Sequence, residues 1–436
     1  MAPGTASTAL LTDHYELTML QASLASGAAH RRCVFELFAR RLTGDRRYGV
    51  VAGIGRVLDA IRDFRFRPEE IAFLRETQVV DEPTLEYLEG YRFTGSIWGY
   101  PEGEVYFPGS PILIVEGTFA EACILETLLL SILNHDSAVA TAASRMINAA
   151  EERPCIEMGS RRTHEDAAVA SARAAYIAGF ASTSNLEAGR RYGVPTRGTS
   201  AHSFTLLHDT ERDAFVAQVD SLGKGTTLLV DTYDVREAVR TAVEVAGPEL
   251  GGVRLDSGDL VAQAREVREQ LDELGATTTR ITVTSDLDEF AIAALAAAPV
   301  DGYGVGTSLV TGSGVPTAGM VYKLVSREGD DGAQVSVAKK ALNKASVGGR
   351  KYAMRRLDER GVAEAEVIGI GEQPDNDGND RNLLVELVRG GEVVSTATLD
   401  DARARHEASV AELPARARRL SRGEPAIPTV YEDDEK

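Results

Sequence analysis

The feature that most constrains the fold is a rhythm of short apolar runs between residues 155 and 305. Each run is followed by an amphipathic stretch, and successive runs begin about 20 to 30 residues apart, the length of one strand plus a returning helix. The runs are residues 155–158, 179–182, 196–199, 227–230, 252–255, 280–284 and 302–305. Seven such units in succession predict a parallel α/β barrel or an open parallel sheet.

Polar residues and glycines gather directly after these runs. They are residues 159–162, 183–185, 202–203, 231, 256–257, 285–286 and 306–307. The carboxyl ends of parallel strands meet at one edge of a sheet, where barrel and open-sheet enzymes place their active sites. The pattern therefore favours an enzyme over a structural protein.

A chain of 436 residues is longer than one ordinary domain. We expect an N-terminal α/β domain over residues 1–120, a catalytic α/β barrel over 121–320 and a small β-rich unit with a tail over 321–436. The most apolar stretch, near residues 120–133, contains Glu121 and Glu126, which predicts a buried helix and not a membrane span.

Charge and cysteine usage exclude several classes of protein. The formal net charge of −19 disfavours a nucleic-acid binder, although local arginines can still form a pocket for a small anion. The N-terminal residues show no basic stretch followed by an apolar core and a small-residue cleavage site, which argues against secretion. Cys33, Cys123 and Cys155 are too few and too widely spaced for a disulfide framework. We expect a cytoplasmic protein with neither a nucleic-acid nor a membrane partner.

The densest cluster of chemistry-bearing residues is the segment 254–259. Arg254 and Asp256 are two residues apart at a strand end and share one face, which pairs a cation with a carboxylate. Asp256 and Asp259 flank a Ser-Gly turn and could hold Mg²⁺ or ribose hydroxyls. The residues alone leave open an ordinary Arg–Asp salt bridge that closes a loop.

A glycine-rich turn follows the last run. Exposed backbone N–H groups at Gly304, Gly306 and Thr307 could cradle a phosphate, and Ser285 and Asp286 follow the preceding run. The segment lacks the lysine of a P-loop. A plain glycine turn is the alternative.

Four further candidates follow other runs. His202 can act as an acid, a base or a nucleophile near neutral pH, although a lone histidine is more often structural. Arg161, beside a second arginine, can bind carboxylate or phosphate, or can simply lie on the surface. Ser184 and Asp231 are further candidates for substrate binding.

Taken together, these segments resemble the nicotinate phosphoribosyltransferase family. The matching segments are residues 12–19, 159–162, 198–203, 230–234, 254–259 and 304–307, in the order in which the family has them. The resemblance implies an irregular α/β barrel of the type II phosphoribosyltransferases and a homodimer with shared active sites. It implies transfer of phosphoribose from phosphoribosyl pyrophosphate to nicotinate, with coupled ATP hydrolysis and a requirement for Mg²⁺.

The resemblance also implies roles for single residues. His202 matches the histidine that ATP phosphorylates, Arg161 and Arg254 match substrate-site arginines, and Asp256 matches the carboxylate on the ribose side. The segment 304–307 matches the loop that binds the 5′-phosphate. Tyr15, which by sequence physics alone would be a core residue, matches an aromatic that stacks on the pyridine ring from the partner subunit.

One position departs from the family pattern. Met158 stands where the family usually has phenylalanine before the glycine. A thioether can still pack on a ring.

Other readings of the sequence are less favoured. A nicotinamide-specific relative would need a carboxylate near residues 182–185, which offer none, and a quinolinate-using relative would need more cations and no ATP-coupling histidine. A Schiff-base aldolase would need a lysine at a strand end, but Lys224, the only lysine between residues 159 and 306, precedes its strand. A non-catalytic barrel would be expected to lose the Arg/Asp cluster, which is intact.

Overall fold

The computed structural model describes residues 7–339 and 346–432, which form two compact units. Unit 1 combines residues up to Ala138 with residues from Thr317 onward, and unit 2 is Val139–Pro316. The segments expected to be the N-terminal domain and the C-terminal unit both lie in unit 1. The long helix α6 (Glu126–Ala150) begins in unit 1 and ends in unit 2.

Unit 2 is built on a six-stranded sheet in the order β7-β6-β11-β10-β9-β8, and every neighbouring pair is parallel. The strands are β6 (Cys155–Glu157), β7 (Ser182–Thr183), β8 (Thr227–Leu229), β9 (Gly252–Leu255), β10 (Arg280–Ser285) and β11 (Gly302–Val305). Because all six run in one direction, the residues after each strand gather at one edge, as the sequence predicted.

Six of the seven predicted runs overlap a strand, although the run at 179–182 does so only at Ser182. The run at 196–199 contributes only a single parallel bridge between Thr196 and Thr183. Pro195, which has no backbone N–H to donate, precedes this bridge. A cavity of about 360 Å³ is lined both by residues 196–199 and by residues 225–227, before and at the start of β8. The α/β class is confirmed, and closure of these strands into a seven-stranded barrel stays a prediction.

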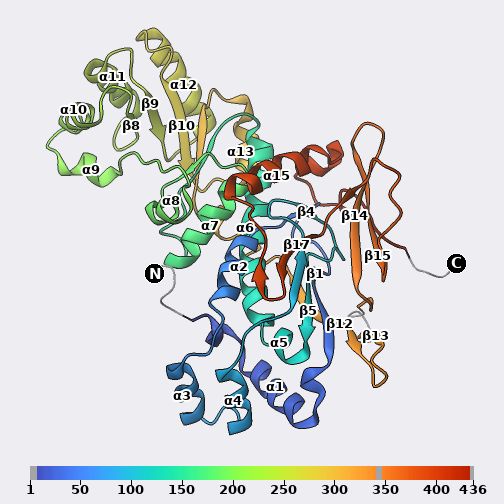
Figure 1. The fold of residues 1–436 in the computed structure, drawn as a ribbon. Helices are drawn as coiled ribbons and strands as arrows, with labels where there is room; N and C mark the ends of the chain where they lie inside the picture. Colours follow the sequence, from blue (N-terminus) through green and yellow to red (C-terminus); the bar gives the residue numbers. More distant parts are fainter. Residues whose placement is uncertain (1–6, 340–345, 433–436) are drawn as a thin grey trace. The chain divides into compact units, whose positions relative to one another are not determined.

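Helices connect the parallel strands of unit 2 and cover the sheet (Figure 1). They are α7 (Glu165–Ile177), α8 (Leu186–Tyr192), α9 (His202–Leu207), α10 (Glu211–Leu222), α11 (Val235–Ala246), α12 (Leu260–Glu273), α13 (Glu289–Ala294) and α14 (Thr307–Val310). Helix α11 illustrates why such a helix packs against the sheet. One of its faces is apolar, because the buried residues recur at helical spacing: Ala238, Val239, Ala242, Val243 and Ala246.

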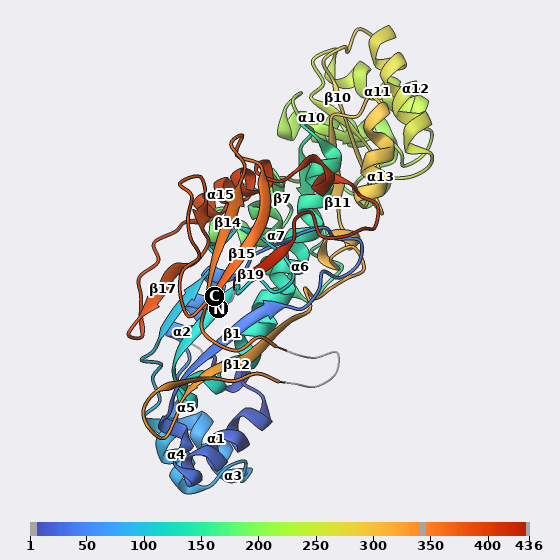
Figure 2. The ribbon, with the colours of Figure 1, turned by 90° about the vertical axis from the view of Figure 1, so that its right-hand side faces the viewer.

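Unit 1 contains a seven-stranded sheet in the order β13-β12-β1-β5-β3-β17-β18. Strand β12 (Met320–Glu328) pairs antiparallel with β1 (Arg32–Ala39), and β17 (Val385–Arg389) pairs with β3 (Ser96–Gly99), so distant parts of the chain share one sheet (Figures 1 and 2). The other strands of this sheet are β5 (Leu113–Thr118), β13 (Gln334–Ser336) and β18 (Glu392–Val393).

Two smaller sheets complete the strands of unit 1. One has the order β16-β14-β15-β19 and the other is the pair β2-β4. Their strands are β2 (Gly49–Val50), β4 (Val105–Tyr106), β14 (Lys351–Leu357), β15 (Ala363–Ile370), β16 (Arg381–Asn382) and β19 (Thr429–Glu432). The helices of this unit are α1 (His14–Ser26), α2 (Ile54–Arg62), α3 (Pro68–Glu76), α4 (Glu82–Glu89), α5 (Phe119–Cys123) and α15 (Leu399–Ala411).

The apolar stretch near residue 120 folds as α5 and the start of α6. By length and composition the helical segment Phe119–Ala150 could cross a membrane, but 67% of its most apolar window is buried within the protein. Leu125, Leu129 and Leu133 are fully buried in the core of unit 1. The predicted buried helix is therefore present.

Candidate functional site

The carboxyl edge of the unit 2 sheet forms a polar cavity of about 240 Å³. It is lined by Met158, Arg161, Arg162, Arg254, Asp256, Thr284, Ser285, Asp286, Gly304, Gly306 and Thr307. These residues come from the ends of β6, β11, β10 and β9, which are four consecutive strands of the sheet. Eight of the predicted site residues therefore line one cavity.

Arg254 lies on β9, the second strand from one edge of the sheet. Its Nη1 donates to Oγ1 of Thr199, and it makes no ion pair with Asp256 within the residues that the structure describes. Burial lowers the pKa of Arg254, the carboxylates of Asp256 and Asp231 oppose that shift, and the neighbouring charge of Arg161 adds to it. Since the two side chains are not bonded to each other, the loop-closing salt bridge is excluded and both are available to a ligand.

Asp256 is held from two neighbouring strands. Its Oδ1 accepts a hydrogen bond from Oγ1 of Thr284 at the end of β10. Its backbone N–H donates to Oδ2 of Asp231, after β8, at 2.8 Å, and the hydroxyl of Ser257 donates to the same Oδ2 at 2.8 Å. The side chains of Asp231 and Thr284 therefore fix the loop after β9. The sequence predicted that these residues lie at strand ends, but not that they bond to this loop.

His202 is the first residue of α9 and faces these carboxylates. Its Nε2 lies 3.8 Å from Oδ1 of Asp231 and 3.8 Å from Oδ2 of Asp256, and its Nδ1 lies 3.2 Å from Oγ1 of Thr232. Oδ1 of Asp231 is buried and accepts no hydrogen bond from any described residue. A protonated or modified imidazole at this position would face two carboxylates.

The other end of the cavity is built from backbone and hydroxyl groups. A Cβ on Gly304 would lie 2.5 Å from Cγ2 of Thr284 and 2.8 Å from Sδ of Met158, so the site tolerates only glycine there. Ser285 has φ of 148°, a conformation that non-glycine residues rarely adopt and that clusters at functional sites. Together with Gly306 and Thr307, these residues line a surface that an oxyanion can approach closely.

Besides His202 and Asp231, three predicted site residues do not line this cavity. Asp259 is exposed and caps α12 by accepting a hydrogen bond of 3.1 Å from the backbone N–H of Ala262. Ser184 is exposed after β7. Tyr15 lies on α1 in unit 1, is 44% exposed, and has a pKa raised to about 12 by burial and by Glu126. Their proposed roles stay predictions.

Sequence reasoning missed one residue beneath the site. Glu157 is the last residue of β6 and is fully buried, with Thr183 of β7 as a hydrogen-bond partner. One feature of the sequence could have identified Glu157: it is a carboxylate inside the apolar run at 155–158. It also stands directly before Met158 and Gly159, at the end of the strand.

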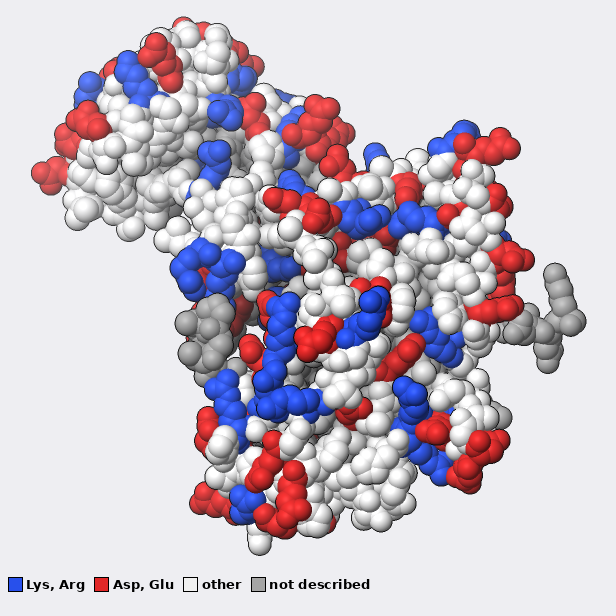
Figure 3. Space-filling model, in the orientation of Figure 1, with Lys and Arg blue, Asp and Glu red and all other residues white. Residues whose placement is uncertain are grey.

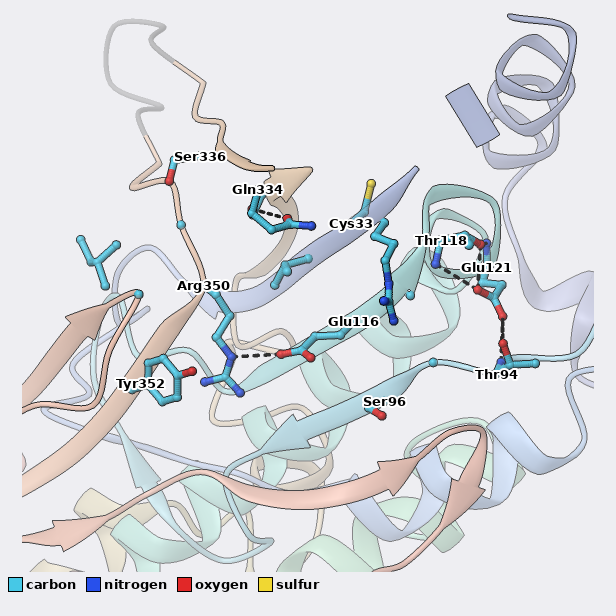
Figure 4. Close-up of a pocket in the computed structure, with 18 of the residues that line it drawn as sticks. Cys33, Thr94, Ser96, Glu116, Thr118, Glu121, Gln334, Ser336, Arg350 and Tyr352 are labelled. Atoms are coloured by element: carbon cyan, nitrogen blue, oxygen red, sulfur yellow. Dashed lines mark hydrogen bonds and ion pairs between the residues drawn. The ribbon is translucent and has the colours of Figure 1, made fainter. Parts of the chain in front are cut away.

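A larger cavity, of about 870 Å³, lies in unit 1 (Figure 4). Most of its charged groups have partners within its own wall: Arg350 pairs with Glu116 at 3.0 Å and stacks on the ring of Tyr352, while Glu121 accepts from Thr94 and Thr118. By contrast, Arg161 and Arg162 in unit 2 make no ion pair with any described carboxylate. The cavity at the strand ends is therefore the better candidate for an anionic ligand.

The distribution of surface charge indicates a small cationic site and not a cationic face that covers much of the protein. Basic and acidic side chains are interspersed over the face seen in Figure 3, and the net charge is −19. The arginines at the strand ends thus form a small positive region in an acidic protein.

Comparison with known proteins gives a consistent result. The family model of the nicotinate phosphoribosyltransferase N-terminal domain matches residues 10–134. A nicotinate phosphoribosyltransferase of Mycobacterium tuberculosis is 57% identical over 429 residues, covering 96% of this chain and 94% of the relative. One from Bacillus subtilis is 38% identical over 384 residues, covering 85% and 78%. The crystal structure of human nicotinic acid phosphoribosyltransferase superimposes with a TM-score of 0.83 at 27% identity, covering 97% of this chain and 98% of the human one.

Proposed function

Since the chain belongs to the nicotinate phosphoribosyltransferase family, we propose that the strand-end cavity of unit 2 joins nicotinate to phosphoribosyl pyrophosphate. The pyridine nitrogen forms a bond to C1′ of the ribose, and the bond from C1′ to the pyrophosphate oxygen breaks. The products are nicotinate mononucleotide and pyrophosphate. The observation that carries the proposal is the meeting of Arg161, Arg162 and Arg254 with Asp256 around one cavity.

The glycine end of the cavity suits the 5′-phosphate of the ribose. Backbone N–H groups near Gly304 and Gly306 and the hydroxyls of Ser285 and Thr307 are the donors that a phosphate accepts from. Glycine at position 304 lets Thr284 and Met158, which also line the cavity, pack against this strand end. Binding energy at this end would place C1′ near Asp256.

Asp256 and the arginines supply opposite charges to the reacting atoms. Positive charge develops on the ribose as the bond to pyrophosphate breaks, and the Asp256 carboxylate would stabilise it. Arg161 and Arg254 would stabilise the negative charge on the leaving pyrophosphate. Thr284 and Asp231 hold Asp256 in place, so little rearrangement is needed during the reaction.

Mg²⁺ fits this site as a partner of pyrophosphate. The described residues include no group of three or more His, Cys, Asp or Glu side chains arranged to hold a metal ion. Mg²⁺ usually takes one or two carboxylates plus phosphate oxygens and water, and Asp256 and Asp286 line the cavity. When bound, the ion would neutralise charge on the leaving pyrophosphate.

ATP coupling is the second part of the proposal. The γ-phosphoryl group of ATP would move to a ring nitrogen of His202, releasing ADP, and water would later hydrolyse the phosphohistidine to inorganic phosphate. Asp231 and Asp256 face the ring, and they would orient it and accept its proton. The free energy of this hydrolysis would favour synthesis of the nucleotide.

Substrate choice and assembly complete the proposal. No carboxylate lies in the segment 182–185, so nothing there repels the carboxylate of nicotinate or favours the amide of nicotinamide. Tyr15 would stack on the pyridine ring of a neighbouring subunit in a homodimer with shared active sites. We place the enzyme in the cytoplasm.

One assay tests the function directly. Purified protein is incubated with phosphoribosyl pyrophosphate and Mg²⁺, with nicotinate or nicotinamide, and with or without ATP. We expect nicotinate mononucleotide and pyrophosphate in equal amounts, formed further toward completion when ATP is present. Turnover of nicotinamide without turnover of nicotinate would overturn the proposed specificity.

A further inference from the structure

Glu157 is a buried carboxylate directly beneath the candidate site. Its exposure is 0%, and its Oε1 accepts a hydrogen bond from the backbone N–H of Gly159, two residues later. Its Oε2 accepts a hydrogen bond from Oγ1 of Thr183, which is also fully buried. The single side chain thus bridges the loop after β6 and the end of β7.

The contacts continue from Thr183 into the next loop. Oγ1 of Thr183 accepts from the backbone N–H of Asn185 at 2.9 Å, and Nδ2 of Asn185 donates to Oγ of Ser160 at 3.0 Å. The backbone carbonyl of Glu157 accepts from the N–H of Ser184 at 2.8 Å. The loop before Arg161 and the loop that carries Ser184 therefore share one closed network.

The network requires an acceptor with two oxygens. A carboxylate can accept from both the Gly159 N–H and the Thr183 hydroxyl, whereas an amide offers one oxygen and turns its NH₂ group toward the other donor. Leaving such a buried donor without an acceptor is unfavourable. The close approach also requires glycine, because a Cβ at Gly159 would lie 3.1 Å from Oε1 of Glu157 and 2.3 Å from Cγ1 of Val310.

We propose that Glu157 is a positioning residue for substrate binding, which acts by fixing the loop that carries Arg161 against the loop that carries Ser184. This inference rests on the proposed function, because it assigns Arg161 and Ser184 to the substrate. Glu157 itself lies below the cavity and does not line it. Among the described residues, the two side-chain hydrogen bonds of Glu157 both go to these loops.

Steady-state kinetics of Glu157→Gln test the proposal. We expect the KM for nicotinate and the KM for phosphoribosyl pyrophosphate to rise about tenfold, the loss of about one positioning hydrogen bond, with a smaller change in kcat. A merely structural role would lower the melting temperature and the active fraction without changing KM. Glu289→Gln is the matched control, because Glu289 is a buried carboxylate of the same unit that pairs with Arg145 and Ser313.

A second pair of variants keeps the test valid if Glu157→Gln folds poorly. Thr183→Val removes the hydroxyl at nearly constant shape and should raise the KM as Glu157→Gln does, whereas Thr183→Ser keeps the hydroxyl and should restore the wild-type KM. An unchanged KM in folded Thr183→Val, or an equal rise in KM in Glu289→Gln, would overturn the positioning role. The wild-type enzyme in the same assay reports on the proposed function separately, because nicotinate turnover there does not depend on the variants.

Discussion

Asp231 accepts a hydrogen bond of 2.8 Å from the backbone N–H of Asp256, and its side chain is only 2% exposed. The contact joins the residues that follow β8 and β9, two neighbouring strands. Since Ser257 donates to the same carboxylate oxygen, Asp231 orders the backbone that carries Asp256. Its other oxygen faces His202, so one buried group touches both parts of the proposed chemistry.

Asp231→Ala should therefore lower kcat by about 100-fold, in the range seen when one preorganised hydrogen-bonding group of a site is removed. The measurement is kcat for nicotinate mononucleotide synthesis, corrected for the folded fraction by circular dichroism. Asp234→Ala is the control: Asp234 caps α11 by accepting from Glu237, so its loss should cost about 1 kcal/mol of stability without this fall in kcat. Equal kcat in Asp231→Ala and wild type would contradict the positioning of Asp256.

His202→Ala should uncouple ATP hydrolysis from synthesis. Without the imidazole no phosphohistidine forms, so the synthesis that remains should release no ADP and should not respond to added ATP. The measurement is the ratio of ADP to nicotinate mononucleotide formed. His208→Ala is the control, because Nδ1 of His208 bonds to the backbone carbonyl of Phe204, whereas His202 faces the carboxylates of Asp231 and Asp256. An unchanged ADP ratio in His202→Ala would refute the proposed role.

The strands of unit 2 could be predicted closely because their pattern is local. The apolar runs at 252–255 and 302–305 coincide with β9 and β11, since a buried parallel strand is a short continuous apolar run between turn residues. Pairing between distant segments could not be predicted. Strand β12 hydrogen-bonds to β1, although most of the chain separates the two strands in the sequence. Alternation of apolar and polar residues predicts which face of a strand is buried, but not which strand it pairs with.

For the candidate site, too, the positions of residues along the strands could be predicted, but their bonding partners could not. Spacing by two correctly placed Arg254 and Asp256 at one strand end, but it suggested that they pair with each other. In the structure Arg254 bonds to Thr199 and Asp256 bonds to Thr284, because the nearest polar groups come from neighbouring segments that sequence spacing does not reveal. Glu157 was missed because a carboxylate in an apolar run does not disclose which backbone donors will surround it.

Ser285→Gly should raise stability and weaken substrate binding together. Ser285 holds φ at 148°, a conformation that costs a non-glycine residue about 1 to 3 kcal/mol, so glycine should raise the free energy of unfolding by about 1 kcal/mol. Loss of the hydroxyl should raise the KM for phosphoribosyl pyrophosphate. Ser285→Ala separates the two effects, since it loses the hydroxyl but keeps the strain. A stability gain of equal size in Ser285→Ala would show that backbone strain is not the cause.

Glu211 should make the stability of unit 2 depend on pH. Burial, with the negative charge of Asp234 nearby, raises the pKa of Glu211 to about 7, and Oε1 is buried without a hydrogen-bond partner in the described part of the chain. Because the folded pKa lies above the ordinary value of 4.5, the folded protein binds this proton more tightly than the unfolded chain does. The resulting stabilisation is fully present below pH 4.5 and is lost as the pH rises through 7.

Glu211→Gln should therefore be more stable than wild type at pH 8, by about 1 kcal/mol once partial solvent exposure is allowed for, and equal to it near pH 4.5. The measurement is thermal unfolding followed by circular dichroism at both pH values. Glu266→Gln, at an exposed position on α12, is the control and should melt with wild type throughout. A constant difference between Glu211→Gln and wild type at both pH values would exclude titration of Glu211 as the cause, because only a group that changes charge between them can make the difference vary.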